Sequence, residues 1–179
     1  MVDSDRSVSS AEDVVIRSFQ PGDETAFRTL NEQWINRYFK VEPKDRATLL
    51  DPRKTILEPG GRILLAIVGG RPVGCCALLL MGEGEFELSK LAVAPGLQGK
   101  GIGRRLLGAA IETARSLHAR RLYLETNHIL TPAVRLYESV GFRHLDPSEV
   151  TPSSYDRADV YMELLLSASD ECYLQSDRI

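Results

Sequence analysis

The glycine-dense stretch Gln-Gly-Lys-Gly-Ile-Gly-Arg, from Gln98 to Arg104, is the part of the sequence best suited to binding an anion. It lies between an apolar run that ends at Val93 and an amphipathic pattern that begins at Gly103. The first turn of a helix presents unpaired backbone N–H groups and the positive end of the helix dipole. Because glycine has no Cβ, a phosphate can approach the main chain closely. The sequence therefore predicts a phosphate or diphosphate site at this loop.

Two other glycine-rich phosphate loops fit this stretch less well. A Walker loop requires Gly-Lys-Ser/Thr, whereas Gly101 is followed by Ile102. A dinucleotide fingerprint requires Gly-x-Gly-x-x-Gly, and in the frame that starts at Gly99 the third glycine is replaced by Arg104. Glu125 does lie roughly 20 residues further on, where a ribose-binding acid would be. An NAD-linked oxidoreductase therefore remains an alternative.

The elements that position the loop follow from the hydrophobic periodicity. Two apolar runs flank Gly69-Gly70, and a second tight connection at 82–85 leads into a third run, which predicts an antiparallel meander. The helical pattern from Gly103 to Leu117 then leads to another apolar run, so these two strands should be parallel, with a right-handed crossover. Strands are expected at 14–19, 62–68, 73–81, 86–93, 121–126, 142–145 and 159–166, and helices from 24, at 45–50, at 103–117 and at 131–140. The pattern is that of an α/β (α+β) fold with a mixed central sheet of six to seven strands and helices on both faces.

The segment Gln-x-x-Gly-x-Gly at 98–103 resembles the acetyl-CoA diphosphate loop of the GNAT superfamily of N-acetyltransferases. Leu-Ala-Val precedes it, a helix follows it, and Leu-Tyr-Glu-Ser-Val-Gly-Phe at 136–142 matches the second motif of that superfamily. Leu-Glu-Thr-Asn at 124–127 and Tyr-x-Arg-Ala-Asp-Val-Tyr-Met-Glu-Leu at 155–164 are similar to a bacterial group, some members of which are fused to MarR-type regulators. The resemblance implies the GNAT acyl-CoA N-acyltransferase fold. It also implies an acetyl-CoA-dependent N-acetyltransferase that transfers the acetyl group to a primary amine by direct attack in a ternary complex.

The resemblance also implies roles for individual residues. Tyr137 corresponds to the general acid that protonates the leaving thiolate, and its alternative role is core packing on an apolar helix stripe. Glu87 lies where some members carry the general base, and its alternative role is a strand carboxylate that pairs with Lys90. Regular alternation would place Ser89 and Val93 on the Glu87 face, and a bulge would reverse that inference. The residues implied to bind acetyl-CoA are Leu91, Ala92, Val93, Gln98, Gly99, Lys100, Gly101, Ile102, Gly103, Arg104 and Asn127.

The acceptor is less well defined by the sequence. Trp34 and Tyr38 belong to the helix that forms one wall of the acceptor site in the superfamily, so they are candidates for substrate contact, with core packing as the alternative. An amine-bearing small molecule or a peptide is the expected acceptor. A non-enzymatic acyl-CoA-binding sensor is the second alternative function. Direct transfer is favoured over a cysteine nucleophile, because no activating group is evident near Cys75 or Cys76.

Composition limits the class of protein. The 179 residues suit one domain, here expected at 13–167, between a disordered tail at 1–12 and a second tail at 168–179. A net charge of −3 argues against a nucleic-acid surface, and no apolar run approaches the ~20 residues of a membrane span. Three cysteines without ligand spacing predict neither a disulfide framework nor a metal site. We expect a cytoplasmic protein, whose closing strand and tail are candidates for pairing in a homodimer.

Overall fold

The computed structural model describes residues 14–166, so both predicted tails lie outside the described residues. The strands are β1 (Val15–Ser18), β2 (Arg62–Val68), β3 (Arg71–Gly82), β4 (Glu85–Val93), β5 (Arg121–Thr126), β6 (Arg143–His144) and β7 (Val160–Leu165). The helices are α1 (Glu24–Tyr38), α2 (Pro43–Leu50), α3 (Ile102–Ser116) and α4 (Thr131–Ser139), with short helical segments η2 (Arg53–Leu57), η3 (Pro95–Leu97) and η4 (Pro147–Glu149). Each long element agrees with an expected one to within a few residues at its ends, whereas η2 is not predicted.

The strands form one seven-stranded sheet in the order β1-β2-β3-β4-β5-β7-β6. Only β4 and β5 are parallel, and every other neighbouring pair is antiparallel. The prediction of a mixed sheet with a parallel crossover through α3 is therefore confirmed.

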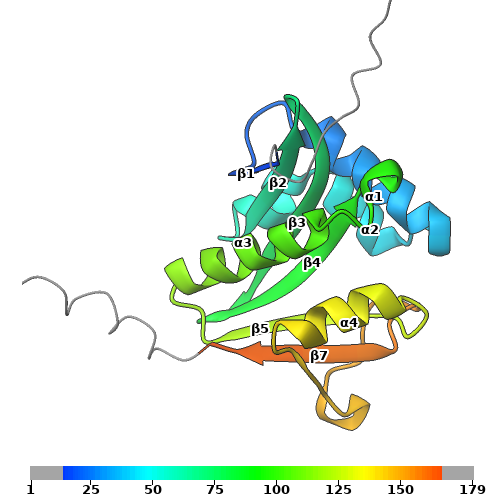
Figure 1. Cartoon of the computed structure of the whole chain (residues 1–179). Helices are drawn as coiled ribbons and strands as arrows, with labels where there is room; N and C mark the ends of the chain where they lie inside the picture. The colour runs from blue at the N-terminus through cyan, green and yellow to red at the C-terminus, as the bar shows by residue number, and fades with distance from the viewer. Residues whose placement is uncertain (1–13, 167–179) are drawn as a thin grey trace, which may run out of the picture.

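Helices cover both faces of the sheet (Figure 1). On one face, α3 and α4 pack on the larger core, in which Leu106, Leu107 and Ala110 of α3 are fully buried. On the other face, α1, α2 and η2 pack on a second core around Phe27 and Ile35. The buried residues of α1 and α3 lie on one face of each helix, as expected for amphipathic helices that cover a sheet.

The two parallel strands separate at the middle of the sheet. β4 pairs with β5 only at Glu85, Phe86 and Glu87, and from there the strands diverge (Figure 1). Within residues 14–166, the edge of β4 that faces β5 has no partner strand beyond Glu87. An open wedge between two strands at their carboxyl ends is a position where α/β sheets bind ligands.

A β-bulge in β4 changes which side chains face this wedge. Ser89 lies opposite Ala77 and Ala92 opposite Cys75, so β4 has one residue more than β3 over this interval. Lys90 has a φ of 56°, a conformation that non-glycine residues rarely adopt. The bulge moves Ala92 into the core under α1, although Leu88 lies in the core under α3.

Regular alternation therefore fails beyond Ser89. Val93 packs against the α3-side core and does not share the face of Glu87, so that expectation is wrong. Glu87 lies between Phe86 and Leu88, which both face the α3-side core, so its own side chain faces the side of α1 and α2. The bulge follows Glu87 in the strand and leaves this orientation unchanged.

Candidate active site

A cavity of about 120 Å³ occupies the wedge between β4 and β5. Its walls come from α1, from β4 between Glu87 and Leu91, from the end of β5, from α4, and from the segment that leads into β7. Both predicted catalytic side chains, Glu87 and Tyr137, line it. The fold thus brings together two groups that are 50 residues apart in the sequence.

Glu87 is the buried carboxylate of this cavity. The residue is 9% exposed. Burial raises the pKa of its carboxyl group; the charge of Lys44 opposes this effect and that of Glu125 adds to it. Lys90 forms an ion pair with Asp45 and not with Glu87. The alternative role of Glu87, a strand carboxylate that pairs with Lys90, is therefore not observed.

Tyr137 reaches the cavity from α4. Its ring packs on Phe142, with centroids 5.8 Å apart, and the residue is 8% exposed. Burial raises the pKa of its hydroxyl, so this group is protonated at neutral pH. Among residues 14–166, no buried side-chain oxygen or nitrogen lacks a partner, and no protein partner is found for this hydroxyl. We conclude that the hydroxyl reaches the cavity.

The glycine loop forms the start of α3 on the larger-core side of the wedge. Gly99 and Gly101 have φ values of 76° and 81°, which only glycine adopts without strain. A Cβ added at either position meets no atom within 4 Å, so the space beside the loop is open. The first hydrogen bond that closes α3 runs from the Arg105 N–H to the Gly101 carbonyl, which leaves the amides at 102–104 without an acceptor within the helix. Open space beside unpaired amides fits a phosphate group.

Side chains of the loop also link it to its neighbours. Gln98 donates to the Val93 carbonyl at 3.1 Å and accepts from Arg37 at 3.0 Å, which joins the loop to β4 and α1. Arg104 donates to Ser139 of α4 at 3.0 Å. Lys100 is exposed.

Three other predicted residues have different surroundings. Trp34 lines the cavity, whereas Tyr38 is 40% exposed and lines a shallow outer depression beside Phe39. Asn127 lines the cavity, but its amide donates to the Arg157 carbonyl at 2.6 Å and accepts from the Ile129 N–H at 3.0 Å. The amide of Asn127 thus holds the end of β5 against the segment before β7.

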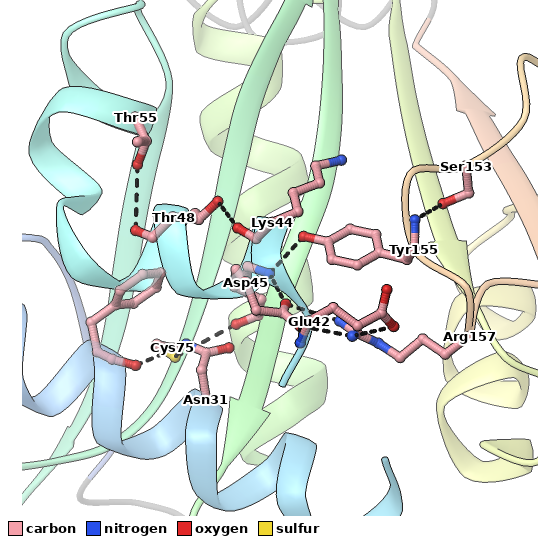
Figure 2. A network of polar contacts seen from close by, with 12 residues as sticks. Asn31, Glu42, Lys44, Asp45, Thr48, Thr55, Cys75, Ser153, Tyr155 and Arg157 are labelled. Atoms are coloured by element: carbon pink, nitrogen blue, oxygen red, sulfur yellow. Dashed lines mark hydrogen bonds and ion pairs between the residues drawn. The ribbon is translucent and has the colours of Figure 1, made fainter. Parts of the chain in front are cut away.

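Four charged residues form an ionic clasp between the two sides of the wedge, and Figure 2 labels three of them, Glu42, Asp45 and Arg157. The clasp consists of Glu42 and Asp45 of α2 and its N-cap, Lys90 at the bulge, and Arg157 before β7. Asp45 accepts from Lys90 at 2.7 Å and from both terminal nitrogens of Arg157, at 2.7 and 2.9 Å. Arg157 also donates to Glu42 at 2.9 Å.

Asp45 is the centre of the clasp. Its side chain is fully buried, and burial alone would raise the pKa of its carboxyl group. The hydrogen bonds from Arg157 and the charge of Lys90 outweigh burial and lower this pKa to about 2. Lys90 also donates to the Tyr155 hydroxyl at 2.9 Å, and the Arg157 guanidinium lies 4.4 Å from the centre of the Tyr155 ring. The clasp therefore holds Tyr155 against the cavity.

Sequence reasoning did not assign a site role to Lys90, Tyr155 or Arg157. The motif Tyr-x-Arg at 155–157 is visible in the sequence, but its contact with α2 spans 112 positions. The positive φ of Lys90 cannot be predicted from the sequence, because lysine rarely adopts this conformation. Only the bulge explains why Lys90 points toward α2.

Other chemistries receive no support from the described residues. Burial raises the pKa of the Cys75 thiol to about 12 and also raises that of Cys76, so neither is a ready nucleophile. Cys172 lies outside residues 14–166. Within that range, no three potential ligands group in a way that would hold a metal ion. None of the helices in the described part combines the length and apolarity needed to span a bilayer.

The chain is similar in sequence to known acetyltransferases. An IAA acetyltransferase of Azospirillum brasilense is 33% identical over 131 residues, which cover 72% of this chain and 84% of that protein. A mycothiol acetyltransferase of Acidothermus cellulolyticus is 32% identical over 157 residues, or 76% of this chain and 47% of that protein. The chain thus spans about half the length of several curated relatives that it matches.

Solved structures show the same fold. A GNAT-family acetyltransferase from Staphylococcus aureus superposes with a TM-score of 0.78 at 21% identity, covering 86% of this chain and 99% of that one. A Salmonella typhimurium structure that contains its cofactor acetyl-CoA gives 0.69 at 22% identity, covering 88% and 96%. The model of the acetyltransferase (GNAT) family matches residues 26–142, which include the glycine loop and the Tyr137 motif. These matches confirm the predicted fold and acyltransferase class, and the chain belongs to the GNAT family of acetyltransferases.

Proposed function

We propose that the protein is an acetyl-CoA-dependent N-acetyltransferase that acts on a primary amine by direct attack in a ternary complex. The observation that carries this proposal is the position of Glu87 and Tyr137 in one cavity. They reach it from the two sides of the wedge between β4 and β5. Acetyl-CoA supplies an activated thioester; the chain must bind it, remove a proton from the amine and return one to the thiolate.

The glycine loop is the proposed site of the diphosphate. The open space beside Gly99 and Gly101 and the unpaired amides that follow support this assignment. In the described part of the chain, no strand pairs with the backbone of 91–93 on the side of β4 that faces β5, so this backbone is a candidate to pair with an extended arm. From the loop, such an arm would run along β4 into the cavity. The side chains of Lys100 and Arg104 and the amide of Asn127 are secondary candidates for cofactor contact.

Glu87 is the proposed base. An alkylamine has a pKa of ~10.4 and must lose a proton before its nitrogen can attack a carbonyl carbon. Burial raises the pKa of Glu87, which makes the carboxylate a stronger base than an exposed glutamate. It also faces the cavity side of β4, where an acceptor between α1 and β4 would lie.

Tyr137 is the proposed acid. A thiolate with a free pKa of ~8.5 leaves more readily when a donor protonates it. The hydroxyl of Tyr137 is protonated at neutral pH and reaches the cavity from the α4 side. Donor and base thus lie on different walls, as a reaction between two bound substrates requires.

The direct mechanism is favoured over an acyl-cysteine intermediate. Burial raises the pKa of both thiols, and the Cys75 thiol donates a hydrogen bond to the Lys90 carbonyl at 3.5 Å. A thiol held protonated in this way is a poor nucleophile.

The test is an acceptor screen that follows release of free CoA thiol over amino acids, polyamines, aminoglycosides and peptide N-termini. The proposal expects acetyl-CoA-dependent thiol release with at least one amine and its loss in Tyr137→Phe. Calorimetric titration with acetyl-CoA and with NAD accompanies the screen. Binding of acetyl-CoA without transfer to any amine would instead identify a CoA-binding sensor, and binding of NAD alone would refute the assignment.

A further inference from the structure

The two cations that line the cavity both belong to the ionic clasp, where carboxylates neutralise their charges. Lys90 and Arg157 both line the cavity, and both pair with Asp45, whose carboxylate is fully buried. Arg157 pairs with Glu42 as well. The clasp as a whole contains two cations and two carboxylates and carries no net charge.

Glu125 is a second carboxylate in the wall of the same cavity. It lies on β5, two residues beyond Tyr123, which is the register partner of Glu87. Its side chain accepts from the Tyr123 hydroxyl at 3.2 Å and from the Ser153 hydroxyl. Both donors are neutral, so the hydrogen bonds hold the carboxylate in place, and none of the residues 14–166 forms an ion pair with it.

The charge balance around the cavity is therefore negative. Beside the clasp, the cavity is lined by Glu87 and Glu125. Among the described residues, Lys44 is a further cation close by: its ammonium is 4.5 Å from the centre of the Tyr155 ring, outside the lining residues. One lysine against two carboxylates leaves an excess of one negative charge. Glu87 is buried and Glu125 is partly buried, so a ligand that supplies a positive charge would offset part of the cost of holding the two carboxylates in one cavity.

We propose that Glu125 binds an ammonium group of the acceptor, so that the preferred acceptors are amines that carry a second positive charge. This inference rests on the proposed function, because it assigns the same cavity to the acceptor. Glu87 takes the proton of the reacting amine, and Glu125 holds the second ammonium from the β5 side. An acceptor with a carboxylate in that position meets like charge and is rejected.

Three probes of equal length separate the effect of charge from that of shape. They are 1,5-diaminopentane, pentylamine and 5-aminopentanoate, whose far ends are cationic, neutral and anionic. Trp34 is the single tryptophan of the chain and lines the cavity, so its fluorescence reports binding. Titrations at saturating CoA should give a dissociation constant for the diamine at least ten-fold below that of pentylamine, with 5-aminopentanoate weakest.

Variants test whether Glu125 is the cause. Glu125→Gln removes the charge and keeps the volume; its amide oxygen still accepts one of the two hydrogen bonds, and the hydroxyl that faces the NH2 group can turn to accept from it. The ten-fold preference should then fall below two-fold. Glu125→Asp keeps the charge and should retain the preference. Glu58→Gln removes an exposed carboxylate outside the cavity and should leave the preference unchanged.

Equal binding of pentylamine and the diamine would overturn the proposal. So would absence of binding by all three probes, or a preference that survives in Glu125→Gln. Thiol release measured on the same samples tests the proposed function separately. A diamine that binds with the expected preference but is never acetylated would refute the transferase reaction and leave the ammonium site in place.

Discussion

Asp45→Asn removes the central charge of the clasp while preserving the shape of the side chain. The pKa of Asp45 falls from 3.8 to about 2 in the folded protein. One pKa unit corresponds to 1.36 kcal/mol, so the charged form contributes about 2 kcal/mol to stability at neutral pH. The variant also leaves Lys90 and Arg157 without their shared partner in a buried site, and breaking such a pair costs about 3–5 kcal/mol. Because asparagine still accepts one hydrogen bond, we expect a loss of about 3 kcal/mol.

Urea unfolding at pH 7 measures this loss. With a denaturant dependence of about 2 kcal/mol per M, the midpoint should fall by about 1.5 M. Asp156→Asn is the matched control, because Asp156 is exposed and makes its contact to Glu42 through the backbone N–H. A lowered pKa means that the contribution is complete above pH 4 and disappears as the pH falls through about 2. The variant and the wild type should therefore converge in acid, and a difference below 0.5 kcal/mol at pH 7 would refute the role given to Asp45.

Three further changes address catalysis and cofactor binding. Tyr137→Phe should lower kcat by about 10²-fold or more, because the leaving thiolate loses its proton donor, while calorimetry shows an unchanged Kd for acetyl-CoA. In a pH profile of kcat/KM, the acidic limb should lie above pH 4.5, because the pKa of Glu87 is raised and the base must be deprotonated to act. Glu87→Gln should abolish this limb and most of the rate. Gly101→Ala should lower the free energy of unfolding in urea by about 1–2 kcal/mol, because alanine is strained at a φ of 81°, and it should also weaken CoA binding. Gly96→Ala is the control: its φ is not positive and no atom lies within 4 Å, so it should change neither stability nor CoA binding.

The sequence predicts much of the fold because its signals are local. Glycine pairs mark the hairpin at 69–70, and a change from apolar runs to helical spacing marks the start of α3. The parallel pairing of β4 and β5 then follows from the helix between them. Tyr137 is found through a motif, and the structure places it in the cavity.

The remaining features of the site depend on long-range contacts. Alternation places Lys90 on the α3 face, and a single left-handed residue reverses that. Asp45 and Arg157 form a hydrogen bond although they are 112 positions apart in the sequence, and no local sequence pattern predicts a contact over that separation. Tyr38 follows Trp34 by one helical turn, yet it is exposed because α1 ends there. The spacing of residues along a helix predicts which side of the helix a residue lies on. It does not predict where the packing neighbours of that side end.

The glycine loop as the binding site of the CoA diphosphate is the central claim, and a crystal structure with bound acetyl-CoA tests it most directly. The account predicts diphosphate oxygens within hydrogen-bond distance of the backbone amides at 99–104 and the sulfur atom beside the Tyr137 hydroxyl. A diphosphate bound away from this loop, or a sulfur atom outside the cavity between β4 and β5, would contradict it.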